Sequence, residues 1–173
     1  MKKIGYLSFD ASVKIHESGR YASTKTSKTG YGGIEGYIRH IDRETDRRNG
    51  CEVNHTNLDI NADLTLENES FFRNELGVWK KTVQSEDMSG AVKRRIQYAK
   101  EHGARIAKVG KNDTVIARPI VIQMDTEMIE NHRDYWYWDV IEILEGMFGE
   151  NNIVGFSIHR DETNVHVHVI FVP

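Results

Sequence analysis

The chain has 173 residues, of which 39% are hydrophobic, and its formal net charge is −3. This length and apolar content suit one domain, residues 1–173, that buries a core without disulfides or a structural metal. The single cysteine, Cys51, excludes an intramolecular disulfide, and the lack of a leader-like or membrane-length apolar run favours a soluble cytoplasmic protein with no membrane segment.

The charge is distributed in alternating tracts. Residues 1–50 sum to +4 and residues 78–118 to +6, whereas residues 51–77 sum to −5 and residues 119–173 to −8. A basic tract can follow a phosphate backbone, and an acidic tract that contains histidines can hold a divalent cation. Solvated helix faces produce the same pattern, so charge alone does not decide between the two interpretations.

The first half of the chain predicts few regular elements. In chain order we expect a strand at residues 2–12, a mobile loop at 17–33, a helix at 33–49 and an irregular acidic link at 57–66. The loop is rich in small polar residues, so we expect it to be poorly ordered in the free protein and open to proteolysis at Lys25 and Lys28. In the helix, Ile34, Ile38 and Ile41 recur at the spacing of one buried stripe.

The second half is richer in predicted elements. We expect helices at 68–83, 88–103 and 126–149, and strands at 115–125, 152–159 and 165–171. Ser89 is a candidate cap for the start of the second of these helices, and Gly103 for its end. The last helix is expected to be the longest, to open at Thr126 and to close at Gly149. Its residues at core spacing are Trp136, Val140, Ile143 and Met147.

The order of these elements predicts the fold class. It favours an α+β fold with a central antiparallel β-sheet and helices packed over one face. Pro119 lies within the strand predicted at 115–125 and lacks a backbone N–H, which suits a strand start or an edge.

Three of the eight histidines gather near the C-terminus. His166 and His168 alternate with valines in a predicted strand, so their side chains should point to the same face. His159 ends the preceding strand, and an antiparallel hairpin would return it beside the other two. Three imidazoles with an open coordination position are typical of a catalytic site for Zn²⁺, Mn²⁺ or another first-row ion. Asp161 and Glu162, in the connecting loop, are expected at the mouth of that site.

A second set of candidate residues lies in the helix predicted at 33–49. A metal that activates a phosphate needs a group to attack it, and a side chain in that role would make a transferase or a nicking and joining enzyme. His40 is the candidate nucleophile, and Arg43, three residues further, is expected to hold a non-bridging phosphate oxygen.

Both sets of residues resemble a known family. The segment "HRDETNVHVH" resembles the metal motif of plasmid mobilization relaxases of the Mob/Pre (plasmid recombination enzyme) type, the histidine-nucleophile branch of the HUH endonucleases. The helix "YIRHIDRE" followed by "NHTNLDINADLTL" is similar to that family's upstream motif. The likeness is specific in these two places and looser between them.

The resemblance implies a function and a role for each residue. It implies a relaxase fold that nicks and joins single-stranded or hairpin DNA at a plasmid transfer origin of a bacterium. His40 would be the nucleophile, Arg43 its phosphate partner and Glu162 an acid/base or ligand-orienting group. His159, His166 and His168 would hold the metal ion, with Mn²⁺ favoured over Mg²⁺ or Zn²⁺.

Two departures from the family pattern are visible. Val165 stands where the family usually has proline before the H-x-H strand, which puts the shape of the loop in question. The sequence ends at Pro173, so we also expect that the family's C-terminal extension, with its DNA-gripping and oligomerising segments, is lacking.

Two other functions remain open at this point. A rolling-circle replication initiator of the same superfamily would use a tyrosine as nucleophile, with Tyr37, Tyr31 and Tyr21 as candidates. A metal-containing repressor module would bind the origin without cutting it. Single replacement of His40 and of each tyrosine separates the first from the family reading, and a test for covalent protein–DNA species separates the second.

Overall fold

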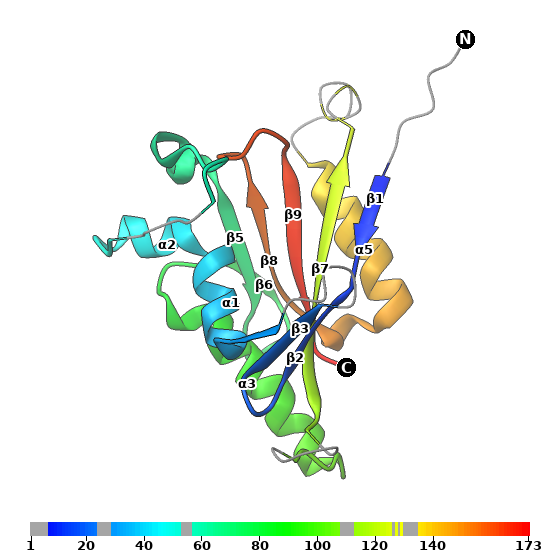
Figure 1. The fold of residues 1–173 in the computed structure, drawn as a ribbon. Helices are drawn as coiled ribbons and strands as arrows, with labels where there is room; N and C mark the ends of the chain where they lie inside the picture. Colours follow the sequence, from blue (N-terminus) through cyan, green and yellow to red (C-terminus); the bar gives the residue numbers. More distant parts are fainter. Residues whose placement is uncertain are drawn as a thin grey trace.

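The computed structural model describes residues 7–23, 29–52, 57–107, 113–125, 127, 129 and 135–173. Its strands form one antiparallel sheet in the order β4-β3-β2-β7-β9-β8-β5-β6, with β1 also paired to β7 (Figure 1). The strands are β1 (Leu7–Asp10), β2 (Val13–His16), β3 (Arg20–Ser23), β4 (Thr29–Tyr31), β5 (Glu69–Arg73), β6 (Trp79–Lys81), β7 (Val115–Met124), β8 (Ile153–His159) and β9 (His166–Phe171). The helices are α1 (Gly33–Ile41), α2 (Arg43–Arg48), α3 (Glu86–Glu101) and α5 (Trp136–Phe148), and the 3-10 turns are η1 (Ala62–Glu67) and η3 (Glu150–Asn152).

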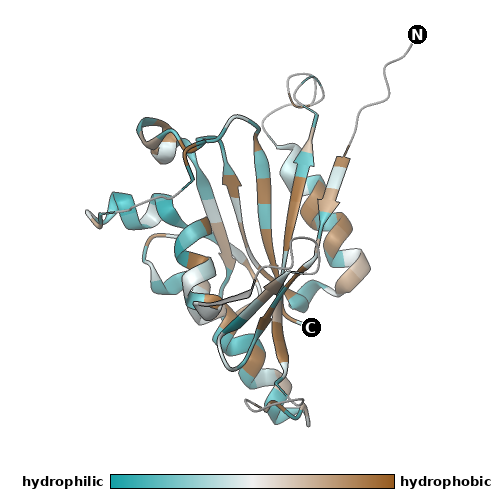
Figure 2. Ribbon diagram, viewed as in Figure 1, coloured by the Kyte–Doolittle hydropathy of each residue, from teal (hydrophilic) through white to brown (hydrophobic). Residues whose placement is uncertain are grey.

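Helices cover both faces of the sheet, so the α+β prediction is confirmed but the prediction of a single covered face is wrong. On one face, Val140, Ile141 and Leu144 of α5 pack in a core cluster with Val167 and Val169 of β9. The opposite face packs against α1 and α3. Its core residues include Ile38, Ile41, Met88, Val92 and Ile170. Hydrophobic and hydrophilic bands alternate along β9 in Figure 2, but the strand is buried on both faces, because its histidines are covered as well as its valines.

Close packing joins α3 to the sheet beside the histidine hairpin. Gly155 of β8 lies so near α3 that a Cβ atom placed on it would be 2.8 Å from Cγ of Met88. A side chain at this position would push the helix away, so glycine permits the close approach.

Two predicted segments have a different structure. Residues 68–83, expected to be helical, form the β5–β6 hairpin, whose turn uses Gly77 at φ +73° and the side chain of Asn74 as acceptor for the N–H groups of Leu76 and Val78. The mobile loop expected at 17–33 contains β3 and β4, which extend the sheet from β2. The turn at Gly77 makes residues 68–83 a hairpin, and the helical spacing of apolar residues gives no sign of this turn. Lys25 and Lys28 lie outside the described residues.

The prediction for residues 126–149 is partly wrong. Within the described part of the chain, α5 starts at Trp136 and ends before Gly149, as expected, but at 13 residues it is shorter than α3, which has 16. Ile143 and Met147, predicted to face the core, are 59% and 65% exposed, and Tyr137, Ile141 and Leu144 are buried instead. The predicted opening at Thr126 lies outside the described residues.

Capping and proline positions also differ from expectation. The N-cap of α3 is Ser85, so Ser89 lies inside the helix, where its hydroxyl donates to the carbonyl of Glu86. Pro119 lies in the middle of β7, at neither a start nor an edge. Pro119 lies between the part of β7 that pairs with β2 and the part that pairs with β1. Its missing N–H therefore removes no hydrogen bond to either of these two strands.

The chain turns sharply between α1 and α2 at Asp42, which interrupts the single helix predicted at 33–49. Asp42 is 3% exposed, and its Oδ1 atom accepts hydrogen bonds from the hydroxyls of Thr45 (2.7 Å) and Thr82 (3.1 Å). Burial raises the pKa of Asp42 to about 6, although these hydroxyls lower it. We call this junction the α1–α2 corner, and it carries His40 on one side and Arg43 on the other.

The parent protein should lose stability as pH rises through the folded pKa of Asp42, and Asp42→Asn should remove this loss. The folded pKa of about 6 lies above the ordinary value of 3.8, so the contribution of Asp42 is complete below that ordinary value and disappears as pH rises through the folded pKa. Between about pH 4 and about pH 8, the free energy of unfolding of Asp42→Asn should therefore rise relative to the parent by about 2–3 kcal/mol. Urea unfolding curves at both pH values measure it, and a difference that does not change with pH would contradict it.

Candidate metal and nucleophile site

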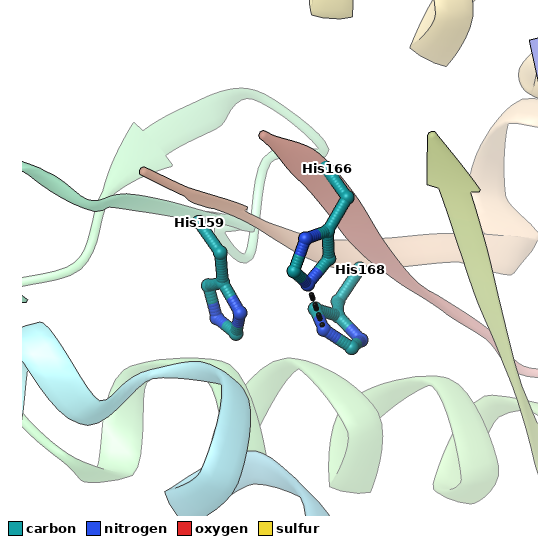
Figure 3. Close-up of side chains that lie close together, drawn as sticks. All are labelled: His159, His166 and His168. Atoms are coloured by element: carbon teal, nitrogen blue, oxygen red, sulfur yellow. Dashed lines mark hydrogen bonds between the residues drawn. The ribbon is translucent and has the colours of Figure 1, made fainter. Parts of the chain in front are cut away.

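The β8–β9 hairpin brings the three predicted histidines together, as strand alternation required. His159 pairs directly with His166, and His168 lies opposite Ser157. The ring centroids of His159 and His168 are 4.5 Å apart, those of His166 and His168 are 4.8 Å apart, and those of His159 and His166 are 5.1 Å apart. Figure 3 shows the three rings on the same side of the hairpin, facing one another. We call these residues the histidine cluster.

Backbone carbonyl groups set the tautomers of two of these rings. Nε2 of His159 donates to the carbonyl oxygen of Ile41 at 2.8 Å, and Nδ1 of His166 donates to that of Asn164 at 2.8 Å. A carbonyl oxygen can only accept, so each of these nitrogens carries a hydrogen. The nitrogens left to bind a metal ion are therefore Nδ1 of His159 and Nε2 of His166.

The histidine cluster favours neutral rings that suit a metal ion. Burial lowers the pKa of His159, and it lowers the pKa of His168 well below the ordinary value, helped by the neighbouring histidines and Arg43. One nitrogen from each of His159, His166 and His168 lies within 4.8 Å of the others. Among the described residues, Nδ1 of His159 is buried without a hydrogen-bond partner. A converging set of neutral imidazole nitrogens with one orphaned lone pair fits a first-row divalent ion.

His40 lies beside the histidine cluster, on the last turn of α1. Its ring centroid is 5.7 Å from that of His168 and 6.1 Å from that of His159. The side chain is exposed, unlike those of the cluster. The structure thus places the predicted nucleophile next to the predicted ligands, with one side open to solvent.

Arg43 differs from its prediction. Its side chain is 0% exposed, and the guanidinium donates from Nε to Asp161 (2.9 Å), from Nη2 to Asp161 and Glu162 (2.8 Å to the latter), and from Nη1 to the carbonyl of His40 (3.1 Å). Four donated bonds leave little of the fork for a phosphate, and no part of it reaches the surface. In this structure the guanidinium therefore forms an internal contact that joins the α1–α2 corner to the loop after β8, and its contact with a phosphate stays a prediction.

The two loop acids occupy different positions. Asp161, expected at the mouth of the site, is 1% exposed and lies beneath it. Burial raises its pKa, but hydrogen bonds from Arg43, Asn68 and Thr65 outweigh that effect and lower the pKa to about 2. Glu162 is partly exposed, and its Oε1 atom is 3.5 Å from Nδ1 of His159 and 4.0 Å from Nε2 of His166. Glu162 is thus the loop acid nearer to the ring nitrogens, although an Asp161 oxygen also lies within 4.8 Å of a His159 nitrogen.

Sequence reasoning missed the role that Tyr37 has in this site. Its hydroxyl lies 3.0 Å from Nδ1 of His168, and its ring is 6.4 Å from that of His40. The signal was available, because Tyr37 precedes His40 by three positions and so shares its face of the helix. From the sequence alone, Tyr37 is a candidate only for a rival nucleophile.

A cavity of about 470 Å³ opens beside His40 and His168. Its wall includes Tyr21, Tyr37 and the backbone of Gly32, Gly33 and Gly36. A second cavity of about 410 Å³ shares Gly32 and Gly33 and is lined by Lys93 and Lys100 of α3. Glu17 and Glu35 also line this second cavity, and Glu35 forms an ion pair with Lys93 at 2.9 Å. The exposed side of the site therefore continues from an apolar cavity to one of mixed charge.

Comparison with known proteins identifies the family. A family model described as plasmid recombination enzyme matches residues 19–173. The chain belongs to the plasmid recombination enzyme family. This membership confirms the resemblance to Mob/Pre relaxases that the two motifs predicted. A search of curated proteins found no match.

Solved structures agree with the plasmid recombination enzyme assignment. The MobM relaxase domain bound to plasmid pMV158 oriT DNA, in a Mn-bound crystal structure at pH 6.8, has a TM-score of 0.61 and 19% identity, and the match covers 99% of this chain and 71% of that chain. A Mn-bound MobM complex at pH 4.6 has a TM-score of 0.59 and 17% identity, and the match covers 99% of this chain and 71% of that chain. A third MobM complex, at pH 5.5, has a TM-score of 0.59 and 19% identity, and the match covers 97% of this chain and 70% of that chain. At these identities the likeness establishes the relaxase-like fold.

The described helices of this plasmid recombination enzyme include none long and apolar enough to cross a membrane. Cys51, the single cysteine of the sequence, is exposed and free.

Proposed function

We propose that this plasmid recombination enzyme nicks and rejoins single-stranded DNA at a plasmid transfer origin through a covalent bond between His40 and the 5′-phosphate. The observation that carries the proposal is the position of the exposed His40 ring, 5.7 Å from the His168 ring of the buried histidine cluster. A nucleophile beside a metal site, facing a solvent-open cavity, is the arrangement that phosphoryl transfer to a side chain needs.

In this proposal, His159, His166 and His168 hold one divalent ion through the nitrogens described above. Mn²⁺ is favoured because the MobM relaxase structures are Mn-bound, and Mg²⁺ or Zn²⁺ are the alternatives. When bound, such an ion supplies a Lewis acid that polarises the scissile phosphate and stabilises the departing oxygen. Glu162, at 3.5 Å from Nδ1 of His159, is the candidate acid or base near the ion and a candidate further ligand.

His40 performs the covalent step. An unprotonated ring nitrogen attacks phosphorus, the N–P bond forms and the bond from phosphorus to the 3′ oxygen breaks. The 3′ oxygen leaves with the electron pair and takes a proton, while His40 keeps the 5′ end. Rejoining is the reverse of this step, and because one phosphoryl bond replaces another, no nucleotide cofactor is required.

The two cavities offer a path for the strand. A nucleotide can occupy the apolar cavity beside His40 and His168 while a neighbouring phosphate reaches Lys100 in the second cavity, where Lys93 is paired with Glu35. The MobM complexes contain oriT DNA, which supports single-stranded DNA as the substrate class. Localisation in the bacterial cytoplasm follows from this role and belongs to the same proposal.

The hydroxyl of Tyr37 is poorly suited to replace His40. It is engaged with Nδ1 of His168 at 3.0 Å, and burial raises its pKa, so the more nucleophilic phenolate is suppressed. Tyr21 lines the same cavity as His40 and remains the tyrosine to test as an alternative nucleophile.

Metal content should depend on the histidine cluster. The purified protein should bind one equivalent of Mn²⁺, and a His166→Ala/His168→Ala variant should bind none, because two of three converging nitrogens are lost. Metal analysis after dialysis measures the content, and circular dichroism verifies the fold. His102→Ala, an exposed histidine on the far end of α3, is the matched control. Equal metal content in the double variant and the parent would refute the assigned ligands.

The test of the proposed function is covalent capture of DNA. The protein is incubated with Mn²⁺ and labelled single-stranded DNA, first the pMV158 oriT sequence of the MobM complexes and then a randomised library. Denaturing electrophoresis should reveal a labelled species at the size of the protein. Binding of DNA without any such species would instead favour the non-cutting repressor module.

A further inference from the structure

The loop between β8 and β9 is held by a segment that is distant in the sequence. This loop, residues 160–165, places Glu162 at the histidine cluster, with its Oε1 atom 3.5 Å from Nδ1 of His159. Val165 leaves the backbone before it without the restriction that a proline would impose. The acidic link, residues 57–66, lies beside the loop and contacts it on both sides of Glu162 (Figure 1).

On one side of Glu162, the acidic link contacts Asp161 in the interior. The amide of Asn61 donates to the carbonyl of Asp161 at 2.7 Å, and the hydroxyl of Thr65 donates to its Oδ2 atom at 2.9 Å. Thr65 and Asp161 are both buried. The buried half of the loop is therefore fixed by two bonds to the acidic link, in addition to the ion pair with Arg43.

On the other side of Glu162, the loop lies at the surface and Asp59 holds it. The hydroxyl of Thr163 donates to Oδ1 of Asp59, and the amide of Thr163 donates to Oδ2 at 3.4 Å. Asp59 is itself oriented by Asn57, whose side chain accepts from the amide of Asp59 at 3.1 Å, as in an Asx-turn. The carboxylate of Asp59 thus restrains both the side chain and the backbone of Thr163.

The two sets of contacts restrain the residue between them. Asp161 and Thr163 are two positions apart, so fixing both sets the direction in which the backbone presents Glu162. Arg43 donates to the carboxylate of Glu162 at 2.8 Å, but a contact with the end of a flexible side chain does not fix the backbone beneath it. The contact with Asp59 is therefore the one that fixes the loop on its solvent side.

We propose that Asp59 is a positioning residue that holds the solvent side of the β8–β9 loop, so that the carboxylate of Glu162 stays next to the ring nitrogens of the histidine cluster. The inference rests on the proposed function, in which Glu162 lies near the bound ion. Asp59 acts through Thr163 and the backbone. Among the described residues, Asp59 belongs to neither of the groups that can converge on one ion.

Hydrogen exchange of the metal-free protein tests the contact itself. In Asp59→Ala the amide of Thr163 loses its acceptor and should exchange about 3–10-fold faster than in the parent, the scale of one lost hydrogen bond. The amide of Asn61 should keep its rate, since its acceptor is the carbonyl of Asp161. NMR measures both rates. Equal exchange of the Thr163 amide in the two proteins would overturn the proposal.

Mn²⁺ affinity tests what the contact does. Asp59→Ala should weaken Mn²⁺ binding by about tenfold, the lower end of the range for losing a group that orients a metal ligand. Thr163→Val removes the hydroxyl but keeps the amide and should weaken binding less, and Thr163→Ser should restore it. Asp63→Ala is the matched control, because it removes the same charge from another exposed position of the acidic link. Isothermal titration gives the affinities, and thermal unfolding of each metal-free variant verifies that it folds.

The double variant Asp59→Ala/Glu162→Gln decides whether Asp59 acts through Glu162. Glu162→Gln alone should weaken Mn²⁺ binding, and adding Asp59→Ala should cause little further loss, because no carboxylate remains to be positioned. If the two losses multiply, or if Asp59→Ala weakens binding no more than Asp63→Ala does, the proposal is wrong and the metal site stands. If Glu162→Gln binds Mn²⁺ like the parent, the part of Glu162 in the proposed function is itself wrong, and the inference falls with it.

Discussion

His40→Ala should lower the rate of covalent DNA capture by at least about 10⁴-fold, the scale of losing a nucleophile that acts in a concerted site. The ring is exposed on α1, and the buried stripe of that helix consists of Ile38 and Ile41, so its loss opens no core cavity. Metal content and DNA binding should therefore remain close to those of the parent. Electrophoresis of labelled DNA under denaturing conditions measures the captured fraction over time.

The chemistry of the bond provides an independent measurement. A histidine adduct is a phosphoramidate, in which protonation of the ring makes imidazole a good leaving group. The adduct should therefore break in mild acid and endure in alkali, whereas a tyrosine phosphodiester survives mild acid. Because attack needs an unprotonated ring, capture should also rise with pH over the range in which the ring of His40 loses its proton.

Matched variants separate the nucleophiles. His102→Ala removes an exposed histidine that lines neither of the two cavities and should capture DNA like the parent. Tyr21→Phe and Tyr37→Phe both keep His40 and should still form the acid-labile adduct. If His40→Ala still formed an acid-stable adduct and Tyr21→Phe did not, the tyrosine-using initiator would replace the proposed mechanism.

Arg43→Met should lower the free energy of unfolding by about 3–5 kcal/mol, the usual cost of removing one partner of a buried ion pair. The loss leaves Asp161, 1% exposed, without the cation that compensates its charge. Chemical denaturation of the metal-free protein measures it. Methionine is chosen because it replaces the aliphatic part of the arginine, so little of the effect comes from a cavity.

Two further variants distinguish an internal contact from a contact with DNA. Arg43→Lys keeps the charge without the planar fork and should lose stability to an intermediate degree. Arg43→Met/Asp161→Asn removes both charges and should be less destabilised than the two single variants added together. An Arg43→Met protein of unchanged stability that fails to capture DNA would restore the phosphate contact first expected from the sequence.

The parts of the site that the sequence could predict are those governed by a simple period. Alternation along residues 165–171 placed His166 and His168 on one face, and the short polar loop before them brought His159 back beside them. The α+β fold with an antiparallel sheet followed in the same way. The roles of these residues as metal ligands remain predictions that the experiments above address.

The parts that the sequence could not predict depend on contacts between distant segments. Arg43 was expected to face DNA because it lies three residues after His40, but the chain turns at Asp42 and directs Arg43 toward Asp161, 118 residues away. Helical period also concealed the turn at Gly77, which makes residues 68–83 a hairpin. In both cases tertiary packing or turn geometry overrides the local pattern.

The α1–α2 corner is fastened to the strand end at two points, by Ile41 to His159 and by Arg43 to Asp161. Thermal opening of the corner would therefore displace His40 and release the orientation of His159 in the same event. A state that retained the metal but lacked the nucleophile would let water attack the phosphate, and water cannot return the strand to its 3′ end. If His40 and the metal ion act as proposed, a corner that makes the two parts fail together would keep such irreversible hydrolysis rare.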